Sequence, residues 1–207
     1  MGLALPAFLV AWTVMMAAMM LPSVAPVASL YSRSISERRA VRLTLFAGGY
    51  LVVWAAAGVL AFGLGAVIAS LADGNSSVAI VAGVGAYGTC GLYQLSPLKY
   101  RCLKECRSPL SLLFKYTSWR GPLRDFRVGL DHGTYCLGCC WSLMVVLLAL
   151  GAMSVVPMLV LAAVVITEKL WTNGETFSRL VGVVSLGFAV ATIWIPDLAP
   201  GFRPGMG

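Results

Sequence analysis

The chain has 207 residues, of which 59% are hydrophobic and 11% charged, and its formal net charge is +7. Soluble domains average about 45–50% apolar and 25% charged residues, so this composition excludes an ordinary soluble domain. It predicts an integral membrane protein whose first partner is the lipid bilayer. The positive charge is explained below by its distribution, and we expect no nucleic-acid partner.

Six apolar segments predict an all-α, polytopic membrane protein that forms a single domain over residues 1–207. Each span needs about 20 residues, and the predicted spans are residues 5–30, 43–71, 78–98, 134–153, 158–170 and 180–195. No basic residue precedes the first apolar run, so we interpret it as a retained span and not as a cleaved signal peptide. Pro22 and Pro26 should kink or end this first helix.

Between the third and fourth predicted spans lies a basic loop, residues 99–131. Within it, Ser108 and Pro109 are typical of a helix start. The residues that follow carry an apolar stripe at helical spacing, which predicts a short interfacial helix in this loop. The tail, residues 196–207, is rich in Gly and Pro and is expected to be irregular.

The basic residues predict the topology. The first, third and fifth connections hold 4, 8 and 2 Lys or Arg residues, and the remaining basic residue is Arg203. Because basic loops stay on the cytoplasmic side, these three connections should be cytoplasmic and both termini should lie outside. We interpret Lys99 and its basic neighbours mainly as anchors to anionic lipid.

A histidine and three cysteines share one predicted helical face. At about 100° per residue, His132, Cys136, Cys139 and Cys140 fall within an arc of roughly 100°. The topology places them at the cytoplasmic boundary, where thiols stay reduced, so a disulfide framework is not expected.

Two further cysteines, Cys102 and Cys106, follow the third predicted span and should reach the same boundary. Reduced thiols with an imidazole are suited to copper or zinc, and we favour copper. The predicted metal ligands are Cys102, Cys106, His132, Cys136, Cys139 and Cys140. Because this set exceeds one tetrahedral site, either the metal is polynuclear, or two sites exist, or some thiols are only neighbours. The alternative, that buried cysteines act as small apolar residues, suits Cys90.

Other side chains are secondary candidates for the metal site. Thioethers bind Cu(I), a neighbouring carboxylate could also be a ligand, and an amide could support a ligand by hydrogen bonding. Apolar packing is the favoured explanation of the thioethers, and packing between helices would equally explain the amide. These secondary candidates are Met15, Met16, Met19, Met20, Glu168 and Gln94.

Four motifs make the chain similar to a known bacterial family. They are residues 12–23 (WTVMMAAMMLPS), residues 93–109 (YQLSPLKYRCLKECRSP), residues 132–144 (HGTYCLGCCWSLM) and the pair Glu168-Lys169. The chain resembles the predicted metal-binding integral membrane proteins over about residues 5–175. That family is a domain of unknown function that is sometimes described as copper-related. The resemblance implies a multi-pass inner-membrane protein that holds metal, and it implies no reaction.

The predicted function is metal handling, such as storage or delivery of copper to a membrane enzyme. We predict no catalytic residues. One alternative is a structural or assembly subunit of a larger membrane complex, in which the glycine-lined third span, with Gly83, Gly85, Gly88 and Gly91, would face a partner. A less favoured alternative is thiol redox chemistry between Cys102/Cys106 and Cys139/Cys140.

Overall fold

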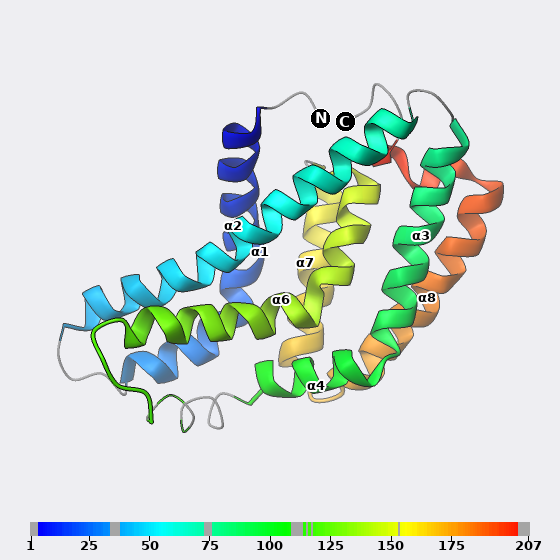
Figure 1. The fold of residues 1–207 in the computed structure, drawn as a ribbon. Helices are drawn as coiled ribbons and strands as arrows, with labels where there is room; N and C mark the ends of the chain where they lie inside the picture. The colour runs from blue at the N-terminus through cyan, green and yellow to red at the C-terminus, as the bar shows by residue number, and fades with distance from the viewer. Residues whose placement is uncertain are drawn as a thin grey trace.

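A computed structural model describes residues 4–33, 38–72, 76–108, 114, 116, 118–152 and 154–202. Within these ranges the chain is helical and contains no strand, as the sequence predicts (Figure 1). The helices are α1 (Leu5–Arg33), α2 (Arg39–Ala72), α3 (Ser76–Gln94), α4 (Pro97–Cys106), α6 (Arg124–Leu150), α7 (Val155–Leu170) and α8 (Gly174–Trp194), followed by the short 3-10 helices η1 (Pro196–Leu198) and η2 (Pro200–Phe202).

Four of these helices, α1, α2, α6 and α8, are long and apolar enough to cross a bilayer. The helices α3 and α4 make a fifth candidate if the pair counts as one span, which is bent by 68°. With 16 residues, α7 is about 24 Å long, short of the roughly 30 Å hydrocarbon core. The described helices are therefore compatible with a membrane protein, with four candidate spans or up to five.

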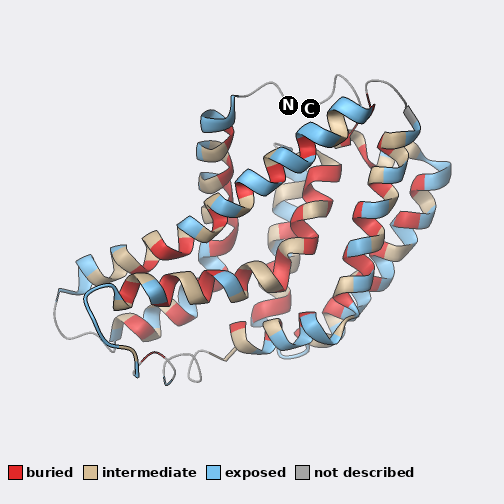
Figure 2. Ribbon diagram, viewed as in Figure 1, coloured by how far each residue is buried: buried red, intermediate tan, exposed pale blue. Residues whose placement is uncertain are grey.

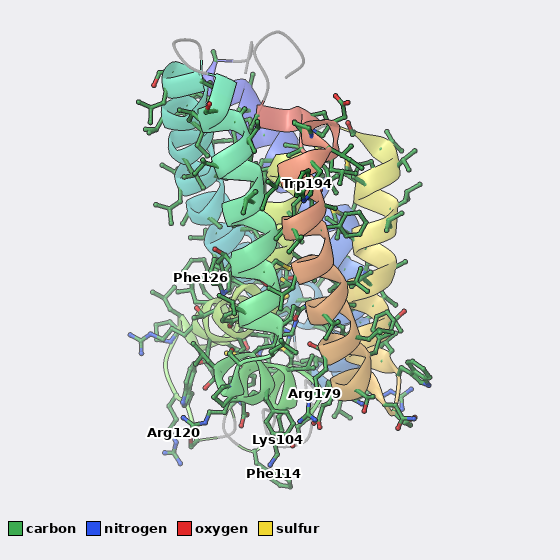
Figure 3. The ribbon with its side chains drawn as sticks, turned by 90° about the vertical axis from the view of Figure 1, so that its right-hand side faces the viewer. Lys104, Phe114, Arg120, Phe126, Arg179 and Trp194 are labelled. Carbon is green, nitrogen blue, oxygen red and sulfur yellow. The ribbon has the colours of Figure 1, made fainter. Side chains whose placement is uncertain are left out.

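The helices run between two ends of the molecule (Figure 1). The start of α1 and the end of the described chain lie at one end, while α4 and the α7–α8 connection lie at the other. Figure 3 shows Lys104, Arg120 and Arg179 at this second end, and Trp194 near the first. The second end is called the basic end below.

The third predicted span is too long. It was expected to reach residue 98, but α3 ends at Gln94 and a new helix begins at Pro97. Ser96 caps α4 because its side chain accepts a hydrogen bond from the Lys99 backbone N–H at 3.2 Å, and Pro97 fits the first helical position. The predicted basic loop, residues 99–131, therefore begins inside a helix, α4. The predicted interfacial helix falls largely on residues 109–117, most of which lie outside the described residues.

The C-terminal tail is more regular than the expected irregular segment, because η1 and η2 each begin at a proline and pack on the bundle. The Tyr87 hydroxyl on α3 donates to the Leu198 carbonyl at 2.7 Å. Phe202 is buried. These contacts hold residues 196–202 against the helices.

The prolines of α1 do not end the helix, which continues through Pro22 and Pro26 to Arg33. Figure 1 shows its second half running at an angle to the first. The last turn is held to the starts of two other helices, because Tyr31 hydrogen-bonds to Asp125 of α6 and its ring packs on Phe46 of α2.

Glycines allow α2 and α6 to touch backbone to backbone. A Cβ at Gly49 would overlap the Phe126 carbonyl oxygen, and a Cβ at Gly129 would overlap the Phe46 carbonyl oxygen. The buried side of the crossing continues into the upright half of α6, which is the most continuously buried part of the fold in Figure 2. The cysteine face of α6 is therefore fixed in the centre of the bundle.

Candidate metal centre

Three thiols of α6 gather around one backbone carbonyl. The Cys139 and Cys140 thiols both donate to the Cys136 carbonyl oxygen, at 3.1 and 2.9 Å. All three side chains are almost fully buried. The i, i+3, i+4 spacing puts them on one side of the helix, as the sequence predicts.

The other two predicted cysteines arrive on α4. Cys106 is buried and belongs to the same core cluster as Cys139. Cys102 is half-buried, and its Sγ lies 3.1 Å from where a Cβ at Gly138 would be. The break after Gln94 allows Cys102 and Cys106 to approach α6, because it turns α4 across the basic end toward that helix (Figure 1). The structure thus brings the two cysteine-bearing segments together.

The Cys136 sulfur also has two polar neighbours from other helices. The Tyr50 hydroxyl of α2 lies 3.1 Å from it, and Lys169 Nζ of α7 donates to it at 3.0 Å. The same ammonium donates to the Ser23 hydroxyl of α1 at 3.3 Å. A buried ammonium needs acceptors or an opposite charge. Cys136 is therefore where α1, α2, α6 and α7 meet.

His132 lies one turn before Cys136 and is 2% exposed. Its ring stands between Phe46 and Tyr50, with centroid separations of 6.1 Å to each. Its Nδ1 has no hydrogen-bond partner in the described part of the chain. Because a buried polar atom without a partner is costly, a metal ligand role at the edge of the thiol group fits this nitrogen.

Next to the thiols lies a buried ion pair that the sequence did not reveal. Lys99 Nζ of α4 donates to Glu168 Oε2 of α7 at 2.7 Å, and the two side chains are 1% and 2% exposed. Gln94 donates to the other carboxylate oxygen at 2.8 Å and accepts from the Ser178 hydroxyl at 3.0 Å. The interpretation of Lys99 as a lipid anchor is therefore wrong. Both carboxylate oxygens of Glu168, a secondary metal-ligand candidate, therefore accept hydrogen bonds within this network.

The network is attached to the cysteine helix through its backbone. Lys99 Nζ also donates to the Cys139 carbonyl, and the Tyr93 hydroxyl donates to the Gly138 carbonyl. The Cys136 carbonyl accepts from two thiols, so three backbone carbonyls within residues 136–139 accept hydrogen bonds from side chains. Figure 1 shows α6 bending about midway along its length. Inserted side-chain donors are a known cause of such bends, so α3 and α4 help to shape the cysteine turn.

A cavity of about 350 Å³ opens beside the same network at the basic end. Gln94 and Lys99 line it together with Glu175 and Arg179 of α8. The polar network is therefore reachable from the side of the basic loops.

A second polar group holds the start of α6. Arg42 of α2 forms an ion pair with Asp125 at 3.0 Å, and the carboxylate also accepts from Tyr31 of α1. Farther along α6, the Asp131 carboxylate accepts a hydrogen bond from the Tyr116 hydroxyl, which precedes this helix, at 3.1 Å. Burial raises the pKa of Tyr116 above its ordinary value, and the Asp131 carboxylate adds to the effect. Tyr116 therefore stays a protonated donor beside the residue that precedes His132.

The remaining candidates are Cys90 of α3 and the four methionines of α1. Cys90 is buried on α3, where the Ser185 hydroxyl of α8 lies 3.7 Å from its sulfur, in keeping with an apolar packing role. The four methionines of α1 are all buried in the same continuous core as the α6 cysteines.

The thiols do not form a ready-made cage. Among the described residues, no three His, Cys, Asp or Glu side chains are arranged to hold a metal ion. The cause is visible in the contacts, since two thiols point at the Cys136 carbonyl and Lys169 points at the third sulfur. All six cysteines are free thiols.

Sequence reasoning missed Tyr50, Lys99, Ser178 and the contact between Lys169 and Cys136. Tyr50 sits in an apolar run and Lys99 among other basic residues, so neither stands out. The signal that existed was the pair Glu168-Lys169, because ionisable residues at the end of an apolar helix tend to be paired and functional.

The described part of the chain is a helical bundle, several helices of which are long and apolar enough to cross a membrane, with free, buried thiols on α6 and α4. The copper chaperone family PpoB2 matches residues 9–192. The chain belongs to this family, which fits the copper-related resemblance seen in the sequence and indicates a role in copper handling. No curated protein and no solved structure matches the chain.

Proposed function

We propose that this protein holds copper(I) in the membrane through the thiols of Cys106, Cys136, Cys139 and Cys140, and passes it to a membrane metalloenzyme. The observation that supports the proposal most is the burial of these four thiols, from α4 and α6, in one core cluster. Thiolate sulfur is a soft ligand that suits both copper(I) and zinc, and the match to a copper chaperone family favours copper. Cys102 and His132 stand at the edge of the group and complete it.

Binding in this proposal requires a local rearrangement. The Cys139 and Cys140 thiols turn away from the Cys136 carbonyl, and the Lys169 ammonium withdraws from the Cys136 sulfur toward Ser23, its other contact. One positive charge then replaces another beside the sulfur. Each thiol that binds as thiolate releases its proton to solvent. Lys169 remains next to the site at Ser23, where its positive charge offsets part of the negative charge of the thiolates.

The proposed membrane arrangement has six spans, with the bent pair α3–α4 as the third and the short α7 as the fifth. The basic end faces the cytoplasm of a bacterial inner membrane, because 14 of the 15 Lys and Arg residues fall within residues 33–42, 99–127 and 169–179, where the spans join at this end. The copper site then lies at the cytoplasmic boundary, where thiols stay reduced.

Copper content tests this function. Protein purified in mild detergent from copper-supplemented cells should carry copper. The triple variant Cys136→Ser/Cys139→Ser/Cys140→Ser should lose it, since hydroxyls are poor ligands for copper(I). Elemental analysis of both proteins is the measurement, and Cys90→Ser is the matched control because this thiol is buried but lies on α3. Wild-type protein without copper, or a triple variant that keeps it, would contradict the proposal.

A second candidate function, assembly of a larger membrane complex, has one observation in its favour. Gly85 and Gly88 of α3 have open space where a Cβ would stand, whereas Gly83 and Gly91 pack within the chain against Ala199 and Leu186. Small residues on an open helix face allow a partner helix to approach. A stable partner that co-purifies with wild type and is lost in Gly85→Leu/Gly88→Leu would support this role.

A further inference from the structure

We infer that Met16, Met19 and Met20 of α1 form a second copper(I) site, built from thioethers, in the membrane core beside the thiol group. This inference rests on the proposed copper function and adds to it a second ligand set and a route. Methionine sulfur is soft and neutral, so it selects copper(I) over harder ions.

The spacing of these methionines puts their side chains next to one another on the helix. Residues at i, i+3 and i+4 are neighbours on a helix surface, with Cβ atoms about 5–6 Å apart. Met16, Met19 and Met20 have this relation. Each side chain has three rotatable bonds, so three thioethers on this turn can converge on one ion without a change in the backbone.

These thioethers point into the bundle and away from lipid. Met16 and Met20 are fully buried and Met19 is 5% exposed, whereas Val14 and Leu21 of the same stretch are 64% and 53% exposed. The lipid-facing side of α1 thus carries Val and Leu, and the inward side at this level carries Met.

The inward face of α1 leads directly to the thiols. On an ideal helix, Met16, Met19 and Met20 lie within about 60° of the direction of Ser23. The Ser23 hydroxyl lies 3.3 Å from Lys169 Nζ, which lies 3.0 Å from the Cys136 sulfur. With a rise of 1.5 Å per residue, the thioethers are about 5–10 Å from Ser23 along the helix. Ser23 and Lys169 therefore lie between the two sulfur groups, and the inferred route for a copper(I) ion runs past them.

The α6 side of the core continues the same series. Met144 is one turn beyond Cys140, at i+4, and is buried in the same continuous core as the α1 methionines. A thioether thus follows the thiols on α6 as well. The core between α1 and α6 carries sulfur from both sides.

Selenomethionine labelling tests the site directly, because copper bound to selenium is distinguishable from copper bound to sulfur by X-ray absorption. Labelled protein in detergent is loaded anaerobically with one and then two equivalents of copper(I). We expect copper–sulfur scattering at the first equivalent and added copper–selenium scattering at the second. The variant Met16→Leu/Met19→Leu/Met20→Leu should lose the selenium signal and retain about one equivalent. Leucine preserves the apolar volume of the core.

Two controls separate this inference from the proposed function. Met158→Leu removes a half-buried methionine of α7 and should leave the selenium signal unchanged. The variant Cys136→Ser/Cys139→Ser/Cys140→Ser should lose the sulfur-bound equivalent and keep the selenium signal. Absence of copper–selenium scattering in wild type at two equivalents would overturn the thioether site while leaving the thiol site standing, and so would a selenium signal that survives in the triple methionine variant.

Discussion

Replacing Glu168 by Gln is expected to lower the free energy of unfolding by about 3–5 kcal/mol, the usual effect of breaking a buried ion pair by removing one partner. The substitution keeps the size of the side chain but removes the charge that balances Lys99. The Lys99 side chain is 1% exposed, so little water reaches its charge in this arrangement. Its other acceptor, the Cys139 carbonyl, lies on the cysteine turn, so the variant should also disturb the thiols.

A double-mutant cycle measures this effect. The midpoint of thermal unfolding in detergent should fall strongly in Glu168→Gln and in Lys99→Met, and it should recover in large part in the double variant, because no buried charge is then left alone. Glu175→Gln, in the first turn of α8, is the matched control and should change little. Two single variants as stable as wild type would show that the pair is not a stabilising contact.

Replacing Gly49 by Ala is expected to lower the free energy of unfolding nearly as much as Glu168→Gln does. Replacing its neighbour Gly48 by Ala should not lower it. A Cβ at Gly49 overlaps the Phe126 carbonyl and comes within 3.0 Å of the Leu130 backbone nitrogen, whereas a Cβ at Gly48 meets nothing within 4 Å. Overpacking costs typically about 1–3 kcal/mol, and more where backbone is struck because backbone cannot change rotamer. Alanine at Gly48 should be neutral or stabilising by up to about 1 kcal/mol, as expected from helix propensity.

The readout for this pair is the yield of folded, monodisperse protein in detergent and its thermal midpoint. Gly49→Ala should lower both, because α2 and α6 must separate and the cysteine face of α6 moves with them. Equal behaviour of Gly48→Ala and Gly49→Ala would contradict the backbone contact between these helices.

The helical class and the gathering of the cysteines could be predicted from local features. Apolar runs define helices, and the distribution of basic residues places Cys102 and Cys106 at the same boundary as Cys136. The end of α3 was missed because Leu95 and Leu98 extend the apolar run, although Ser96-Pro97 is a good helix start. The six-span count could not be settled in this way, because α7 has 16 residues and α3–α4 is bent.

The polar partners of the thiols could not be predicted because they depend on contacts between residues far apart in the sequence. Tyr50 and Cys136 are separated by 86 residues, and Gln94 and Ser178 by 84. No periodicity or local motif encodes such pairs. Lys99 is the clearest example, since its sequence neighbours favour a lipid anchor and only the packing of α4 on α6 and α7 reveals its ion pair with Glu168.

The central claim is that buried thiols of α4 and α6 hold the copper, and the affinity of a single-cysteine variant tests it most directly. Copper(I) is titrated anaerobically into wild type, Cys139→Ser and Cys90→Ser in competition with bathocuproine disulfonate. Loss of the Cys139 ligand should weaken binding by more than the roughly 10- to 100-fold that follows loss of an outer-shell partner, while Cys90→Ser should bind as wild type does. Equal affinities for all three proteins would contradict the claim.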